Sequence, residues 1–357
     1  MIQKFNKQPI EPDQPDLPNL PNLPNLHDQP DQRHQNELHL IGFGSQGRSW
    51  AQNLRDSGWS VRIYLSATSI QAASPSWVDA QNLGFEVRST HELALLSSRS
   101  ESHLIAFACP DHHIAGIYQD QLSQLNIPLS LILLHGFAVY SGELKLLNDR
   151  HKVELFAPKA IGPQIRKIFK KGQTHDLVAA VTTKAPFILA LAQGLGFSPE
   201  NLVVTQPEVE AIGDLISEQG LLCGGIFTLM DWTITAMRNA GTPGPLIAEE
   251  CITELLLIAG LIKERGLEAT LGAISKAALA GTATMNQAFE ESGFKSMFLD
   301  KVSRVVDRKF VNDFNRGQWQ TQAEALALRF QEHDRFLGLK KQNSNSSNTQ
   351  INKGYDK

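Results

Sequence analysis

The sequence predicts an α/β fold in which an N-terminal, doubly wound Rossmann-type sheet is followed by an all-helical C-terminal domain. Short strand-like runs alternate with helical or loop stretches between residues 38 and 205. A glycine-rich turn follows the first of these runs. From Glu208 to about Phe330, strand signals give way to long apolar helical stretches. We therefore expect the boundary between the two architectures near Pro207.

Composition divides the chain into four segments. Residues 1–36 are rich in Pro, Asn, Asp and Gln and contain a triple PNL repeat, so they predict a disordered arm. Residues 37–206 carry the predicted nucleotide-binding sheet, and residues 207–335 the helical domain. The polar run at residues 336–357 predicts a second disordered tail.

Charge and cysteine content exclude several classes of protein. A formal net charge of −4 over 357 residues gives no reason to expect nucleic acid as a partner. The three cysteines are an odd number set among hydrophobic residues, which fits reduced thiols better than disulfides. No apolar run approaches the ~20 uncharged residues of a membrane span. We expect a soluble, cytoplasmic protein with neither nucleic acid nor a membrane among its partners.

The first strand-like run, Leu38–Ile41, leads into GFGSQG and then into the helix-like segment RSWAQNLRDSG. In dinucleotide-binding folds the first glycine permits the tight turn, the second lets backbone approach a pyrophosphate, and the third allows close helix packing. The helix N-terminus adds amides and a positive dipole end. The alternative is an ordinary glycine-rich turn. The candidate cofactor-binding residues here are Gly42, Phe43, Gly44, Ser45, Gln46 and Gly47.

The second run, WSVRIYL, ends in Ser66-Ala67-Thr68-Ser69, where an NAD-binding fold usually has an acid for the ribose hydroxyls. Hydroxyl groups can bind a 2′-phosphate that a carboxylate would repel. We therefore expect NADP(H) rather than NAD(H), with Ser66 and Ser69 among the binding residues. A polar turn at the end of a strand is the alternative.

Further strand-like runs predict the rest of the sheet: Phe85–Ser89, His103–Cys109, Leu131–Leu134, Val153–Ala157, Leu177–Thr182 and Leu202–Thr205. Ligands bind beyond the carboxyl ends of such strands. Pro110-Asp111, His135-Gly136-Phe137 and Pro158-Lys159 each follow a run and are candidates for that reason. Taken singly, His135 also fits a core histidine and Lys159 a surface lysine.

Two pairs of acids lie four residues apart in apolar helical sequence. Asp214 with Glu218, and Glu250 with Glu254, each share one helix face. No Lys or Arg lies between Lys184 and Arg238, and buried carboxylates need a cation. An all-oxygen set favours a hard ion such as Mg²⁺. The alternative is that these are solvated faces of amphipathic helices.

Together these segments resemble ketol-acid reductoisomerase, the acetohydroxy acid isomeroreductase of branched-chain amino acid biosynthesis. The resemblance runs from about residue 38 to about residue 320. Its specific motifs, in order, are GFGSQGRSWAQNLRDSG, LHGF at Leu134–Phe137, APK at Ala157–Lys159, GDLISEQGLLCGG at Gly213–Gly225 and EECITEL at Glu249–Leu255.

The resemblance implies an NADP(H)-binding Rossmann domain, a helical domain with a knotted core, and two Mg²⁺ ions. It implies that Asp214 bridges the metals and that Glu218 ligates one of them. Glu250 and Glu254 would reach the site from the partner subunit, which implies a homodimer or higher oligomer. Their positions in the motifs carry these roles.

The implied reaction converts a small 2-acyl-2-hydroxy acid such as 2-acetolactate to a 2,3-dihydroxy acid, by alkyl migration and hydride reduction. Glu254 would shuttle a proton, and Ser275 lies where the family uses a serine against the substrate. His135 and Lys159 match polar residues near the nicotinamide and the metal-bound water.

Three segments depart from the family pattern. The family's ISxTAxYG signature is here ISKAALAG, with Ala277 and Ala280 in place of Thr and Tyr. Ala160-Ile161 follows the lysine where Gly-Pro is common, and Ser66 replaces an arginine. Two alternatives therefore stay open: an NADP(H) dehydrogenase acting on another hydroxy or oxo acid, and a nucleotide-binding homologue without turnover.

Overall fold

A computed structural model describes residues 36–96, 103–173, 176–317 and 319–339 of the chain. The predicted disordered arm lies outside the described residues except for Asn36. The predicted tail, residues 336–357, lies outside the described residues from residue 340 onward. Its first two residues are helical, because the last helix continues to Leu337.

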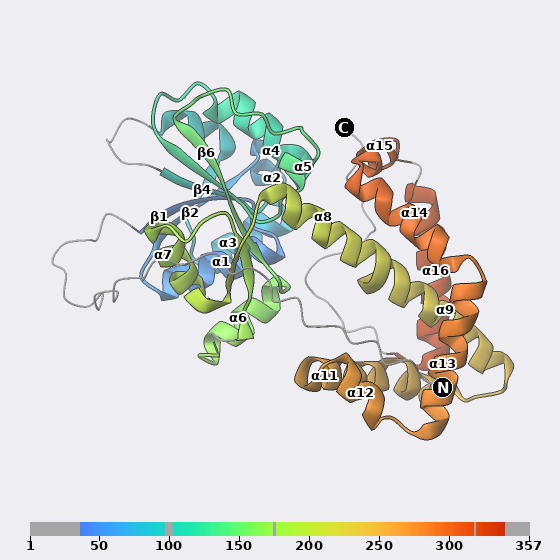
Figure 1. The fold of residues 1–357 in the computed structure, drawn as a ribbon. Helices are drawn as coiled ribbons and strands as arrows, with labels where there is room; N and C mark the ends of the chain where they lie inside the picture. The colour runs from blue at the N-terminus through green and yellow to red at the C-terminus, as the bar shows by residue number, and fades with distance from the viewer. Residues whose placement is uncertain (1–35, 97–102, 174–175, 318, 340–357) are drawn as a thin grey trace, which may run out of the picture. The chain divides into compact units, whose positions relative to one another are not determined.

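The sheet region forms an eight-stranded sheet in the order β3-β2-β1-β4-β5-β6-β7-β8 (Figure 1). Its strands are β1 Glu37–Ile41, β2 Ser60–Leu65, β3 Val87–Ser89, β4 His103–Phe107, β5 Leu129–Leu133, β6 His151–Pro158, β7 Ala179–Val181 and β8 Leu202–Val204. Every pair of neighbours is parallel except β6 and β7, which run antiparallel. Each predicted run overlaps one strand, although β5 and β6 each begin two residues before their runs. The Rossmann-type prediction is confirmed.

Helical segments cover both faces of the sheet. They are α1 Ser45–Asp56, α2 Ala67–Gln71, α3 Pro75–Asn82, η2 Thr90–Leu95, α4 Asp111–Ile117, η3 Tyr118–Leu122, α5 Phe137–Tyr140, α6 Gly162–Lys170, α7 Pro186–Leu195 and η5 Pro199–Asn201. One hydrophobic cluster joins the sheet to α1, α3, α6 and α7, and a second joins it to η2, α4, η3 and α5. Within β1, Leu40 belongs to the first cluster and Ile41 to the second, because successive strand residues face opposite sides.

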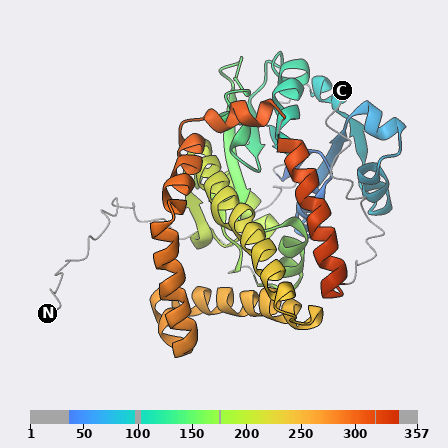
Figure 2. The same cartoon turned by 90° about the vertical axis from the view of Figure 1, so that its right-hand side faces the viewer.

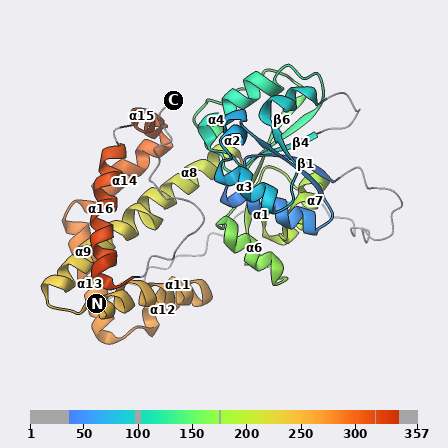
Figure 3. The same ribbon diagram turned by 180° about the vertical axis from the view of Figure 1, so that it is seen from behind.

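The rest of the chain is helical, as predicted, and α8 leads into it from the sheet (Figure 3). Its helices are α8 Pro207–Ser217, η6 Glu218–Leu222, α9 Gly224–Asn239, α10 Gly244–Ala248, η7 Glu249–Thr253, α11 Glu254–Arg265, α12 Leu267–Ala273, α13 Lys276–Glu291, α14 Phe294–Val306, α15 Lys309–Asn315 and α16 Trp319–Leu337. The segments η6 and η7 are π-helical and continue directly from α8 and α10.

One continuous helical stretch, Pro207–Asn239, is long and apolar enough to cross a membrane by length and composition alone (yellow in Figure 2). Helices of soluble proteins pass the same test, so this is weak evidence. Its longest uncharged run is residues 219–230, between Glu218 and Asp231. That run is well short of the ~20 uncharged residues of a membrane span.

Candidate active site

The turn after β5 brings His135 and Gly136 to the first turns of α8. The Gly136 amide donates a hydrogen bond to Oε2 of Glu210 at 2.7 Å. A Cβ atom on residue 136 would lie 1.8 Å from the carbonyl oxygen of Pro207, so only glycine fits there. The turn is therefore held against α8 by the backbone as well as by a carboxylate.

Lys159 follows β6 and reaches the same helix. Its Nζ donates to Oε1 of Glu210 at 2.6 Å and to Oδ1 of Asp214 at 3.1 Å. The Glu210 side chain is only 2% exposed, and Asp214 lies one helical turn further along α8. Lys159, which is distant in sequence, thus partly neutralises the negative charge of Glu210 and Asp214. The sequence around these two acids contains no Lys or Arg that could do so.

His135 completes the cluster. Its Nε2 lies 3.2 Å from Oδ2 of Asp214 and 3.8 Å from Oε2 of Glu210. Burial lowers the pKa of His135, but the carboxylates of Asp214 and Glu210 outweigh burial and leave the pKa above its ordinary value. His135, and then Lys159, lower the pKa of Asp214 to about 2. The same carboxylates raise the pKa of Lys159 despite its burial.

Two further acids adjoin this cluster. Burial raises the pKa of Asp111, at the start of α4, although the charge of His135 opposes the shift. Partial burial, and then the charge of Asp214, raise the pKa of Glu218. Both acids therefore lie within electrostatic reach of the cluster formed by His135, Lys159, Glu210 and Asp214.

Within the described ranges, His135, Glu210 and Asp214 are the residues close enough to share a metal ion. One ligand atom from each lies within 4.8 Å of the others. Two carboxylates and an imidazole suit a divalent cation. Of these three residues, sequence reasoning assigned only Asp214 to a metal.

The predicted metal ligands are not all turned inward in this chain. Asp214 is half-buried, whereas Glu218, Glu250 and Glu254 are exposed. Within one chain, three of the four predicted ligands therefore face solvent, because the apolar helices around them are not covered on every side.

Both carboxylate pairs lie at π-helical segments. Glu218 is the first residue of η6, Glu250 lies in η7, and Glu254 begins α11 directly after it. Short π-helical insertions recur at functional sites, where they re-aim side chains. The regular i, i+4 spacing in the sequence gave no sign of this change in helix geometry.

The glycine turn has the geometry of a phosphate-binding loop. A Cβ at Gly42, whose φ is +96°, would lie 2.6 Å from the Ala108 carbonyl oxygen, and one at Gly47 would lie 2.7 Å from that of Gly42. At Gly44, by contrast, the space within 4 Å is open. Gly44 and Ser45 also begin α1, so its free amides face this opening.

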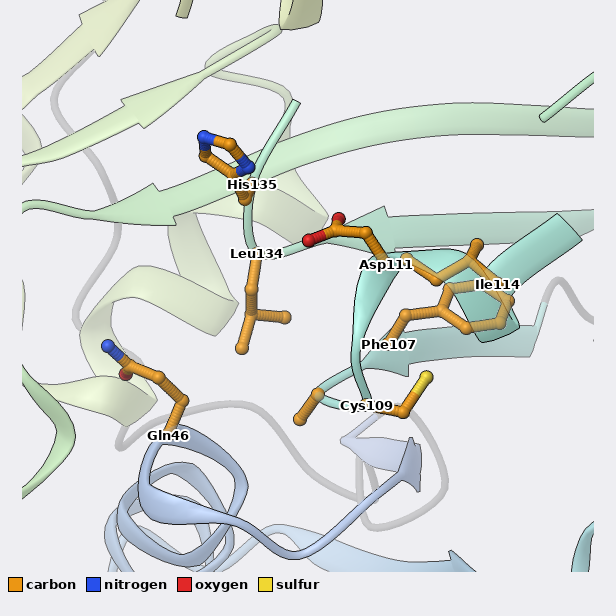
Figure 4. Close-up of a pocket in the computed structure, with 8 residues that line it drawn as sticks. Gln46, Phe107, Cys109, Asp111, Ile114, Leu134 and His135 are labelled. Atoms are coloured by element: carbon orange, nitrogen blue, oxygen red, sulfur yellow. The ribbon is translucent and has the colours of Figure 1, made fainter. Parts of the chain in front are cut away.

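A small cavity of about 120 Å³ connects this turn to His135 (Figure 4). Gln46 lines one end and donates through Nε2 to the Ala160 carbonyl at 2.8 Å. Its Oε1 is buried without a partner in the described part of the chain. Phe43 belongs to the buried core instead. The remaining lining residues are Phe107, Ala108, Cys109, Asp111, Ile114, Leu134 and His135.

Hydroxyl groups gather at the carboxyl end of β2. The Ser66 Oγ caps α2 by accepting from the Ser69 amide at 3.1 Å, and it lies 3.0 Å from the hydroxyls of Ser69 and Thr68. All three contacts are exposed. Pro110 precedes α4 at the end of β4 and makes no side-chain cap.

Ser275 lies in the helical region, where it caps α13. Its Oγ accepts from the Ala278 amide at 3.1 Å, and its side chain is exposed. Ala277 and Ala280 are also exposed on α13. The described contacts do not join Ser275 to His135 or Asp214 within one chain.

Sequence reasoning missed Glu210, whose carboxylate contacts both Gly136 and Lys159. The sequence does contain a signal for it. Glu210, Asp214 and Glu218 are spaced by four residues along one helix face, but only Asp214 and Glu218 were predicted to bind metal.

Comparisons with known proteins agree with this arrangement. Residues 34–199 match the acetohydroxy acid isomeroreductase NADPH-binding domain, and residues 208–353 match the ketol-acid reductoisomerase C-terminal domain. The fold and site therefore define an oxidoreductase with a nucleotide-binding sheet and a helical partner region. The chain belongs to the ketol-acid reductoisomerase family, as the resemblance predicted.

Individual relatives support the assignment. The ketol-acid reductoisomerase (NADP(+)) of Sulfurisphaera tokodaii is 30% identical over 292 residues, covering 78% of this chain and 84% of that protein. The Sulfolobus acidocaldarius enzyme of the same name is 29% identical over 295 residues, 79% of this chain and 85% of that protein. The structure of an NADH-preferring ketol-acid reductoisomerase from an uncultured archaeon superposes with a TM-score of 0.69 at 25% identity, covering 82% and 90% of the two chains.

Proposed function

We propose that this protein is an Mg²⁺-dependent, NADP(H)-using isomeroreductase of branched-chain amino acid biosynthesis. Its substrates are 2-acetolactate and related 2-acyl-2-hydroxy acids, which it converts to 2,3-dihydroxy acids. The observation that carries the proposal is the cluster of Lys159, Glu210, Asp214 and His135. Of these residues, His135 lines the cavity that Gln46 of the glycine turn lines at its other end.

The sheet region holds the cofactor. The open space at Gly44 would receive the pyrophosphate, and Gln46, whose buried Oε1 has no partner in the described part of the chain, would offer the cofactor an acceptor. Asp111, Pro110 and Gly136 border the nicotinamide end, and Ser66 and Ser69 offer hydroxyls to a 2′-phosphate. The nicotinamide supplies the hydride, and the chain determines where it is aimed.

The helical region would hold the two Mg²⁺ ions. Glu210, Asp214 and Glu218 bring three carboxylates against the single ammonium of Lys159, which leaves a negative surplus for a divalent cation. Asp214 and Glu218 of this chain would hold the ions, together with Glu250 and Glu254 of a second copy of the chain. Bound Mg²⁺ supplies Lewis-acid polarisation of the substrate oxygens.

The side chains of this chain orient the substrate and handle its protons. Lys159 and His135 hold Asp214 ionised, so its oxygens keep a fixed direction. The Ser275 oxygen already accepts from an amide, which leaves its hydrogen to donate to a substrate oxygen. Glu254, contributed by the partner subunit, would pass a proton to or from the reacting alkoxide.

We also propose a homodimer or larger assembly in the cytoplasm. Exposed apolar side chains surround the proposed partner-subunit ligands: Leu255 and Leu256 follow Glu254, and both are exposed. A second copy of the helical region would cover them and carry its own Glu250 and Glu254 to this site.

The decisive experiment is NADPH oxidation with 2-acetolactate, with and without Mg²⁺. We expect the dihydroxy acid to form only when both are present. Turnover that EDTA leaves unchanged would instead indicate a metal-independent dehydrogenase. Stoichiometric NADPH binding without consumption, across several 2-acyl-2-hydroxy acids, would indicate a homologue that does not turn over.

A further inference from the structure

The turn that carries His135 has little structure of its own. Strand β5 ends at Leu133, and α5 is a single helical turn, Phe137–Tyr140. An isolated turn of helix is not stable in water, so contacts with the rest of the protein must set its conformation. The bond from Gly136 to Glu210 anchors its beginning.

Tyr140 anchors its end to a segment far away in the sequence. Its ring is fully buried, and its hydroxyl donates to the Val305 carbonyl at 2.7 Å. Val305 lies in the last turn of α14, which stops where Arg308 adopts a left-handed backbone with φ of +58°. The Arg308 guanidinium lies 5.8 Å from the centre of the Tyr140 ring. The end of α14 is thus shaped around this tyrosine.

The ring of Phe137 lies near both Tyr140 and His135. Its ring is nearly parallel to His135, at 9° and 6.4 Å between centres. On its other sides it lies 5.8 Å from Tyr140 and packs edge-on against Phe314 of α15 at 5.6 Å. The imidazole of His135 therefore lies beside the Phe137 ring, whose position depends on packing against the C-terminal helices.

We propose that Tyr140 is a positioning residue for His135. Its hydroxyl ties α5 to the end of α14, and through Phe137 this sets where the imidazole stands relative to Asp214. The inference deepens the proposed function by adding the C-terminal helices to the machinery that aligns the site. It requires no direct contact between Tyr140 and substrate.

Tyr140→Phe tests the proposal, because it keeps the ring and removes only the hydroxyl. Tyr118→Phe is a matched control: Tyr118 is also fully buried, and its hydroxyl contacts Nδ1 of His151 at 3.1 Å and the Leu147 amide at 3.0 Å. Both variants lose a buried hydroxyl contact, but only one lies beside His135.

Two measurements separate positioning from general stability. For Tyr140→Phe we expect kcat with 2-acetolactate to fall about threefold to tenfold, the effect of one hydrogen bond, with an unchanged KM for NADPH. We also expect faster amide hydrogen exchange at Gly136. Tyr118→Phe should lose comparable thermal stability and change neither quantity. Phe314→Leu should repeat the Tyr140 pattern without touching the hydroxyl.

Equal losses of kcat in the two tyrosine variants, or unchanged Gly136 exchange in Tyr140→Phe, would overturn the proposal. If the wild-type protein shows no turnover, the proposed function fails. The exchange comparison then decides the positioning role by itself, because it needs no activity.

Discussion

The sheet region and the helical region use similar apolar residues with opposite results. In the sheet, strand residues such as Leu40 and Leu131 are completely buried. In the helical region, α11 and α13 bury no residue fully, and Leu256 remains 68% exposed. Helices on both faces of the sheet bury its apolar side chains within one chain. The second region leaves apolar faces that its own helices do not cover.

The difference separates what one chain does alone from what it needs a partner to do. Burying apolar surface contributes roughly 25 cal/mol per Å², so exposed faces as large as those of α11 favour association. The cofactor turn lies in the self-sufficient region, whereas Glu250 and Glu254 lie on the uncovered one. Cofactor binding and metal chemistry should therefore respond differently to mutation.

The largest expected effect comes from Asp214→Asn. Removing the charge that Lys159 and His135 both contact should lower kcat by about a hundredfold to a thousandfold, the scale for losing one preorganised electrostatic group. NADPH affinity, a property of the sheet region, should stay nearly unchanged. Steady-state assays and fluorescence titration with NADPH measure the two quantities.

Glu208→Gln, in the first turn of the same helix, is the control and should retain activity. An equal loss of NADPH affinity in Asp214→Asn would mean that the two regions are not functionally separate.

A charge on the uncovered face should have the next largest effect. Leu256→Glu should weaken self-association by about tenfold to a hundredfold, because burial of a leucine is worth about 1.5–3 kcal/mol. Turnover should fall with the fraction of assembled protein, while NADPH binding stays. Sedimentation velocity over a concentration series measures the assembly.

Leu95→Glu is the matched control, since Leu95 is 74% exposed but belongs to the sheet region. It should assemble like the wild type. A Leu256→Glu protein that is monomeric yet fully active would contradict the idea that the site is completed by a partner.

The same comparison explains what could be predicted from the sequence. Strands with short apolar runs, such as β5, where the sequence predicted Leu131–Leu134, are recognisable because burial on both faces leaves a local pattern. The pairing of Lys159 with Glu210 spans 51 residues, and no local pattern encodes it. The antiparallel direction of β7 and the π-helical segments η6 and η7 are likewise set by tertiary packing.

Ser66→Asp should alter the choice of cofactor by a smaller amount. A carboxylate beside the hydroxyl cluster should lower kcat/KM for NADPH about tenfold through repulsion of the 2′-phosphate, a modest effect at an exposed, screened site. Aspartate is also a good N-cap, so α2 should keep its start. The kcat/KM for NADH serves as the internal control and should not fall. Equal losses with both coenzymes would point to damage in α2 instead.

The smallest expected effect concerns the pH dependence of stability in the sheet region. His39 is buried in β1, and its Nδ1 lies 3.0 Å from the Tyr64 hydroxyl. Burial first, and then the positive charges of His103, Arg62 and Arg88, lower the pKa of His39 from 6.5 to about 3. The folded protein thus keeps this imidazole neutral at pH values where the unfolded chain protonates it.

The sign of the effect follows from proton uptake. Below about pH 6.5 the unfolded state binds a proton at His39 that the folded state does not, so stability falls as the pH drops from 6.5 toward 3. At pH 5.5 this amounts to about 1.4 kcal/mol relative to pH 8, or about 2 degrees in Tm. His39→Gln cannot protonate, so its Tm should decline less between pH 8 and pH 5.5 than that of the wild type. The Tm of His91→Gln, which changes an exposed histidine in η2, should decline like that of the wild type.

If the Tm of wild type and of His39→Gln declined in parallel, water would reach His39 readily. This part of the sheet core would then be more accessible to solvent than the burial of His39 indicates.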